Sequence, residues 1–148
     1  VDRIPLDALV GPCFVADLTA LGEGSVIGAN DLESARIPSG TRRLLLKTDN
    51  SRRLIGAGSA FFPDYVALSD GACEWIVSHG IALVGIDYLS VTADANSLSG
   101  HRTLLSSSTV ILEGLNLSGI EPGAAVLLCL PLKVVGADGA PARAILGR

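Results

Sequence analysis

The chain is poor in the residues on which metal and acid–base chemistry usually depend. Its 148 residues include two histidines, three cysteines, one tryptophan and no methionine, and aromatic residues make up only 4%. The cysteines, Cys13, Cys73 and Cys129, stand far apart among apolar neighbours. An odd number without paired spacing argues against a disulfide framework and against a zinc knuckle. We expect three small, buried thiols in a cytoplasmic protein.

Long hydrophobic runs are also absent, although 49% of the residues are hydrophobic. The apolar stretches at 43–47, 81–86 and 124–130 are far shorter than the roughly 20 residues that a membrane-spanning helix needs. Lysine and arginine number 11 against 15 acidic residues, and they form no long cluster. We therefore expect neither a membrane nor a nucleic acid as a partner.

Short runs of Val, Ile and Leu dominate what is present. Continuous rather than alternating runs are typical of strands covered on both faces, as in α/β proteins. Four such strands are predicted, at residues 13–16, 43–48, 81–88 and 109–112. Residues 124–135 predict a longer strand that Pro131 bends or places at a sheet edge. Asp138-Gly139 is a turn signal and indicates a hairpin to a last strand at 142–146.

Helical patterns alternate with these strands, at residues 29–36, 70–78 and 101–106. The helix at 70–78 is the best defined, because Ser69 can cap its start and Gly80 follows its end. Its predicted buried face is Ala72, Cys73 and Ile76. Residues 49–63 and 91–100 are predicted to be loops. With no repeat or linker, 148 residues suit a single domain.

The sequence contains few motifs that are typical of catalysis. The stretch 22–28 is glycine-rich but lacks the Lys-Ser/Thr ending of a phosphate loop, and no Gly-x-Ser-x-Gly elbow is present. His79 precedes Gly80 at a predicted helix end, where a histidine favourably caps free carbonyls. Phe61, Phe62 and Tyr65 fit either an aromatic-acceptor pocket or internal packing, and we favour packing.

His101 and Glu113 are brought together by the predicted elements. A helix of about six residues rises ~9 Å, and a strand of about four returns ~13 Å. If the strand runs back along the helix, both side chains reach one edge of the sheet. There an imidazole and a carboxylate can share a divalent cation such as zinc or manganese. The alternative is an accidental pair, although Glu113 interrupts an apolar segment where a carboxylate without a partner is costly.

Several stretches in order resemble the cyclase family of metal-dependent hydrolases, which includes kynurenine formamidases and isatin hydrolases. Residues 85–90 match its Gly-Ile-Asp-x-x-Ser strand end, and 101–105 its His-x-x-Leu-Leu segment. Residues 113–117 match Glu-x-Leu-x-Leu, followed by Pro-Leu-Lys at 131–133 and Gly-x-Pro-x-Arg at 139–143. The similarity runs from about Ile4 to the C-terminus.

The resemblance implies a fold and half of a site. The expected fold is a single α/β domain, residues 1–148, with a mixed, curved sheet and outer helices, lacking the family's N-terminal segment. In the family a histidine and a glutamate of this region ligate metal, which maps onto His101 and Glu113. Asp87 and Ser90 lie in the matched strand end but are expected to be structural.

The resemblance also implies a function with a gap. The family's remaining ligands belong to an upstream His-x-Gly-Thr-His-x-Asp-x-Pro motif, and its acid/base is a further histidine just after that motif; this chain lacks both. Catalytic residues are therefore expected upstream of Val1, and this chain alone is expected to be inactive. The parent protein would be a metal-dependent, arylformamidase-like hydrolase of an amide, lactam or related C–N or C–O bond in a small molecule. It would form homo-oligomers, dimers or tetramers.

Two alternatives to a hydrolase stay open. One is a non-catalytic scaffold or binding subunit that keeps the fold without the metal site. The other is a mis-started gene product without a function of its own.

Overall fold

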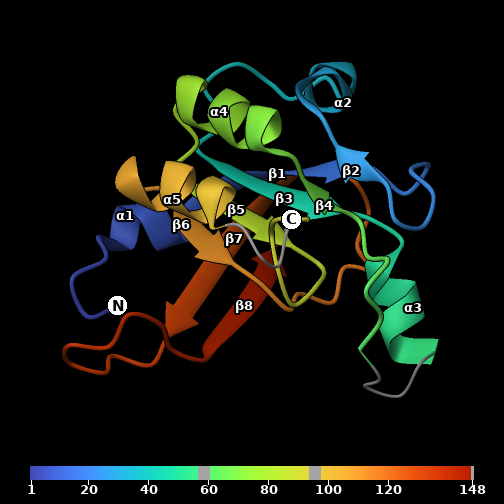
Figure 1. Cartoon of the computed structure of the whole chain (residues 1–148). Helices are drawn as coiled ribbons and strands as arrows, with labels where there is room; N and C mark the ends of the chain where they lie inside the picture. Colours follow the sequence, from blue (N-terminus) through green and yellow to red (C-terminus); the bar gives the residue numbers. More distant parts are fainter. Residues whose placement is uncertain (57–60, 94–97, 148) are drawn as a thin grey trace.

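The computed structural model describes residues 1–56, 61–93 and 98–147. Its elements, labelled in Figure 1, are α1 (Leu6–Leu9), β1 (Val10–Asp17), β2 (Val26–Ile27), α2 (Ala29–Ser34), β3 (Arg43–Lys47), α3 (Asn50–Gly56), β4 (Ala67–Leu68), α4 (Asp70–Ser78), β5 (Leu83–Ile86), α5 (Ser99–Ser106), β6 (Val110–Leu112), β7 (Gly123–Pro131) and β8 (Ala142–Gly147).

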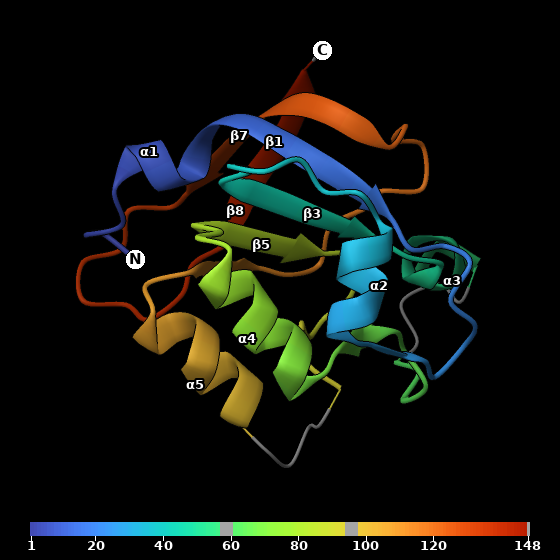
Figure 2. The same ribbon diagram turned by 90° about the horizontal axis from the view of Figure 1, so that it is seen from above.

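Six strands form one mixed sheet in the order β6-β5-β3-β1-β7-β8. The first four are parallel, whereas β7 is antiparallel to β1 and β8 is antiparallel to β7. The sheet curls, so that β7 and β8 turn away from the plane of β3 and β5 (Figure 2). The strands β2 and β4 form a separate parallel pair. The predicted single α/β domain with a mixed, curved sheet and outer helices is confirmed.

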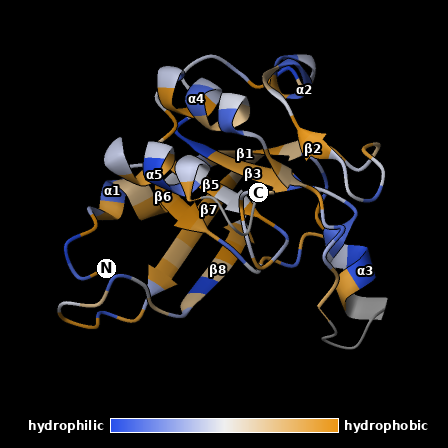
Figure 3. Cartoon of the chain, in the orientation of Figure 1, coloured by the Kyte–Doolittle hydropathy of each residue, from blue (hydrophilic) through white to orange (hydrophobic). Residues whose placement is uncertain are grey.

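Two apolar cores lie on the two faces of this sheet. On one face, α2, α4 and α5 cover the strands (Figure 2), and Leu44 and Leu46 of β3 pack there. On the other face, Leu45 packs with residues of β1, β7 and the segment after β6. A strand buried on both faces needs apolar side chains at consecutive positions. This explains the uninterrupted runs, which Figure 3 shows as hydrophobic strands beside helices of mixed hydropathy.

The helix α4 forms as its sequence predicts. Ser69 accepts a hydrogen bond at Oγ from the Ala72 amide, 3.1 Å away, and satisfies one free donor of the first turn. Ala72, Cys73 and Ile76 are its buried residues. Gly80 adopts a φ of +70°, the left-handed conformation that a glycine after a helix end provides. All three cysteines of the chain are buried and free.

The predicted loop at residues 49–63 is wrong in its first half, where α3 forms. Asn50 is buried and bonds twice to Val66, through its amide nitrogen and oxygen. Ser51 is also buried and bonds to Asp87. Partners 16 and 36 residues away thus hold a polar stretch in a helix, and local composition cannot reveal them. The part of this prediction at 57–60 lies outside the described residues.

Other predicted boundaries move as well. Residues 91–100 are not simply a polar loop, because Val91 is buried and α5 begins at Ser99; residues 94–97 lie outside the description. The strand predicted at 81–88 is shorter, as β5. The strand predicted at 124–135 stops at Pro131, which pairs with Ala142 beyond the part of β7 that β1 borders. A proline there costs no hydrogen bond on the open side.

Phe61, Phe62 and Tyr65 gather around Tyr88. The Tyr65 and Tyr88 rings stack with centroids 4.3 Å apart, and Phe62 lies 4.5 Å from Tyr88. The Tyr88 hydroxyl donates to the Phe62 carbonyl, and the Arg53 guanidinium covers the Phe62 ring. These contacts agree with the favoured packing role for Phe62 and Tyr65, whereas Phe61 touches the cluster but is 64% exposed. No helix in the described residues is long and apolar enough to cross a bilayer.

Candidate metal site

His101 and Glu113 meet where α5 and β6 form an antiparallel return. His101 lies in the first turn of α5, and Glu113 directly follows β6. The turn between them is closed by Thr109, whose amide donates to Leu104 and whose hydroxyl donates to Ile81. As a result, Nε2 of His101 lies 3.2 Å from Oε1 of Glu113. The convergence predicted from helix and strand lengths is confirmed.

Two consecutive residues, Val91 and Thr92, hold this pair. Glu113 Oε1 accepts a hydrogen bond from the Val91 amide at 2.8 Å. His101 Nδ1 lies 3.0 Å from the hydroxyl of Thr92. The side chains of His101 and Glu113 are 25% and 33% exposed, and both line one groove beside β6. The site is therefore partly shielded from water yet accessible from the surface. Sequence inspection did not identify the contributions of Val91 and Thr92.

The donor set suits a divalent cation. Two donors that bind one ion at about 2.1 Å with a near-tetrahedral angle lie about 3.4 Å apart, close to the observed 3.2 Å. An imidazole nitrogen and a carboxylate oxygen are ligands that zinc and manganese accept. In the described residues no group of three or more histidine, cysteine, aspartate or glutamate side chains could hold a metal. This part of the chain thus offers two ligands, fewer than the three typical of catalytic zinc.

Asp87, at the end of β5, is fully used by the fold. Its carboxylate accepts bonds from the hydroxyls of Thr48 and Ser51, at 2.6 and 2.8 Å, and from both backbone amides. Burial raises the pKa of the Asp87 carboxyl above its usual value, although the four hydrogen bonds oppose the shift. Ser90 donates to the Thr92 carbonyl. Both residues are structural here, as expected.

The second histidine is a helix cap. His79 Nδ1 lies 2.8 Å from the Trp75 carbonyl, and its ring stacks on Trp75 with centroids 3.7 Å apart. The Trp75 indole donates to Glu33 of α2. The predicted capping role is thus what the structure shows.

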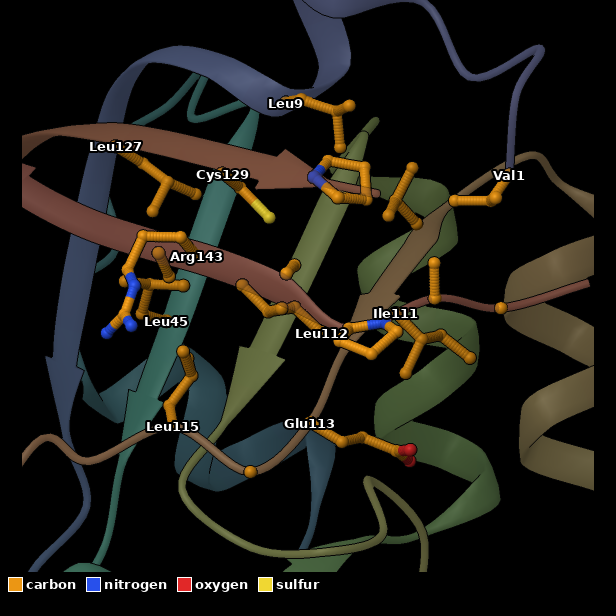
Figure 4. Close-up of a pocket in the computed structure, with 18 of the residues that line it drawn as sticks. Val1, Leu9, Leu45, Ile111, Leu112, Glu113, Leu115, Leu127, Cys129 and Arg143 are labelled. Atoms are coloured by element: carbon orange, nitrogen blue, oxygen red, sulfur yellow. The ribbon is translucent and has the colours of Figure 1, made fainter. Parts of the chain in front are cut away.

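A cavity on the opposite face of β6 escaped sequence inspection. It measures about 650 Å³ and is lined by both ends of the curled sheet, including Leu112 of β6 and Leu127 and Cys129 of β7. In Figure 4, Leu112 and Leu115 point into this cavity, whereas the Glu113 carboxylate points away from it. Glu113 therefore lies on the rim between this cavity and the groove that His101 lines.

Comparison with known proteins extends the similarity beyond motifs. The Cyclase family model, described as "Putative cyclase", matches residues 1–93. Cyclase-like protein 1 of Oryza sativa subsp. japonica is 38% identical over 148 residues, which cover 99% of this chain and 53% of that protein. The chain thus spans about half the length of this relative. Kynurenine formamidase of Salinibacter ruber is 36% identical, with 98% of this chain and 66% of that protein covered.

A solved structure agrees with the sequence comparisons. The structure of a potential metal-dependent hydrolase with cyclase activity superimposes with a TM-score of 0.87 at 34% identity, covering 99% of this chain and 69% of that one. The family model stops before His101 and Glu113, but the alignments with relatives include them. The family inferred from the motifs is confirmed: this chain belongs to the cyclase family.

Proposed function

We propose that this chain forms part of a metal-dependent hydrolase that cleaves an amide, lactam or related bond in a small molecule. The observation that carries the proposal is the 3.2 Å approach of His101 Nε2 to Glu113 Oε1 in an accessible groove. The names of a kynurenine formamidase relative and of a structurally similar metal-dependent hydrolase support the reaction class.

Each residue would have a distinct part in holding zinc or manganese. His101 supplies the lone pair of a neutral ring nitrogen. Glu113 supplies a negatively charged carboxylate, and the Val91 amide orients its Oε1. When bound, such a cation polarises a scissile carbonyl and activates water. Further ligands and a proton shuttle would come from polypeptide beyond this chain, in keeping with its coverage of about half of the plant relatives. By itself the chain would bind metal weakly and turn over no substrate.

Metal content tests the proposal. The purified chain is equilibrated with zinc or manganese at concentrations high enough to fill a weak site, and bound metal is measured by equilibrium dialysis for wild type, His101→Ala and His79→Ala. The proposal expects a loss of metal for His101→Ala only, because His79 caps a helix elsewhere. Equal metal in all three proteins contradicts the ligand assignment.

The gene's upstream sequence decides between an enzyme and a scaffold. An in-frame His-x-Gly-Thr-His-x-Asp upstream of Val1 supports the hydrolase, and the longer protein is then assayed with an arylformamide. If no such motif lies upstream, or if the longer protein binds no metal and releases no formate, the scaffold or binding-subunit alternative is favoured.

A further inference from the structure

Consecutive residues of one short segment hold the two candidate ligands. The Val91 amide donates to Glu113 Oε1, and the Thr92 hydroxyl lies 3.0 Å from His101 Nδ1. Val91 and Thr92 belong to neither α5 nor β6, so they are an independent constraint on both ligands. The side chain of Thr92 is almost inaccessible, with the residue only 4% exposed.

The segment is itself firmly anchored. Thr92 forms a parallel bridge with Leu68. The Leu68 amide donates to the Val91 carbonyl, and the Ala93 amide donates to the Leu68 carbonyl. The Thr92 carbonyl accepts hydrogen bonds from the hydroxyls of Tyr65, at 2.9 Å, and Ser90, at 3.1 Å. A buried group that is held on several sides can impose its position on a neighbouring ring.

The methyl group of Thr92 is held as well. A Cβ placed on Gly100 of α5 would come within 2.6 Å of Thr92 Cγ2 and 3.0 Å of Cys73 Sγ. The absence of a side chain at Gly100 lets α5 approach this closely, one residue before His101. The packing therefore leaves little room for the hydroxyl to move away from the imidazole.

A hydroxyl suits this position because it can both donate and accept. While Nε2 carries a proton toward Glu113, Nδ1 has a lone pair, and Thr92 donates to it. When Nε2 instead offers its lone pair to a cation, the ring proton resides on Nδ1. The Thr92 hydroxyl oxygen then accepts a hydrogen bond from Nδ1–H. The neutral ring has the same number of protons in both states.

We infer that Thr92 is a positioning residue, which aims Nε2 of His101 at the position beside Glu113 and keeps a hydrogen bond to Nδ1 in the Nδ1-protonated form that a cation requires. The metal-binding part of this inference rests on the proposed function. Histidine ligands of metals characteristically donate a hydrogen bond from their second ring N–H to an oxygen acceptor, and loss of that acceptor typically lowers affinity 10–100-fold.

Zinc affinity of the full chain tests this by competition with a chromophoric chelator. Thr92→Val keeps the volume and the packed methyl but removes the hydroxyl, so the zinc Kd should rise about 10–100-fold. Thr92→Ser restores the hydroxyl and should return the Kd to near the wild-type value. Thr41→Val is the control, since it removes a threonine hydroxyl that donates to the Pro38 carbonyl and bonds to neither His101 nor Glu113. Unchanged affinity in Thr92→Val, or no rescue by Thr92→Ser, would overturn the inference.

A second measurement separates this inference from the proposed function. In metal-free protein, the ring nitrogens of His101 are observed by ¹⁵N NMR; the chain has only two histidines, so His79→Gln assigns them. Thr92→Val should move the Nδ1 resonance toward that of a nitrogen without a hydrogen bond, and Thr92→Ser should reverse the move. An Nδ1 resonance insensitive to both changes refutes the positioning role. If wild type binds no zinc yet Nδ1 responds, the proposed function fails and the positioning role stands.

Discussion

Nε2 of His101 and Oε1 of Glu113 lie 3.2 Å apart, although 12 residues separate them along the chain. The helix α5 and the strand β6 run in opposite directions, so the start of one meets the end of the other. Glu113 lies directly after β6, between the cavity inside the curled sheet and the groove that His101 lines. Its charge is thus compensated by His101 and the Val91 amide in a mostly apolar setting.

Replacing Glu113 with glutamine should separate metal binding from folding. The amide keeps the length of the side chain and can accept the Val91 hydrogen bond, but a neutral oxygen is a poor ligand for zinc. We expect the zinc affinity to fall on the order of 100-fold or more, whereas the unfolding free energy without metal changes by less than about 1 kcal/mol. Thermal unfolding with and without zinc measures both quantities. Glu74→Gln, on the exposed side of α4, is the control; an equal zinc-induced rise in Tm for wild type and Glu113→Gln argues against the site.

Gly85→Ala should destabilise the centre of the sheet. A Cβ at this position would lie 2.6 Å from Leu45 Cδ2 and 2.9 Å from Leu115 Cδ1. Overpacking of a filled core costs about 1–3 kcal/mol, and urea unfolding followed by circular dichroism would measure it. Gly119→Ala is the control, because no atom lies within 4 Å of the added carbon. Equal unfolding midpoints for the two variants would show that Leu45 and Leu115 move aside freely.

Asp87→Asn should destabilise the protein most strongly at acid pH. The asparagine offers one acceptor oxygen to four donors, from Thr48 and Ser51, so donors are left unsatisfied at a cost of about 1–3 kcal/mol. Burial holds the pKa of the Asp87 carboxyl above its unfolded value. Because the folded pKa is the higher one, proton binding at Asp87 stabilises the folded wild-type protein. This stabilisation is fully present below the unfolded pKa and is lost as pH rises through the higher folded pKa.

The asparagine variant lacks this titration. The difference in unfolding free energy between wild type and Asp87→Asn should therefore shrink as pH rises through that window. Urea midpoints of both proteins at a series of pH values from acid to neutral would measure it. A difference that grows with pH would mean that the pKa of Asp87 is lowered rather than raised in the folded protein.

Leu128→Lys should disrupt self-association. One face of the β7–β8 ribbon presents Val126, Leu128, Leu130 and Ile145 with exposures of 37–52%. Contiguous exposed apolar side chains of this kind are typical of interfaces. We expect wild type to sediment as a dimer or tetramer and Leu128→Lys to shift toward the monomer. Leu6→Lys, a similar change on α1, should leave the mass unchanged. A monomeric wild type at every concentration would remove the expectation of a homo-oligomer.

Local rules in the sequence were sufficient for most of the elements. The helix α4 is specified by neighbours in sequence, with Ser69 at its start and Gly80 after its end, so it was predicted with its bounds and buried face. The approach of His101 to Glu113 was also accessible, because only one helix, one turn and one strand separate them. Short-range geometry limits such a segment to a few arrangements.

Only the tertiary structure decided the surroundings of that pair. Thr92 reaches His101 because Leu68, Tyr65 and Gly100 hold it in place, and none of these contacts has a signature in local sequence. For the same reason α3 was predicted as a loop, since its polar residues are ordered by partners as distant as Asp87. The sequence by itself determined which residues are apolar, the approximate positions of most helices and strands, and the two candidate ligands. The curl of the sheet and the partners of buried polar groups depend on which distant segments pack together, and that is a property of the whole chain.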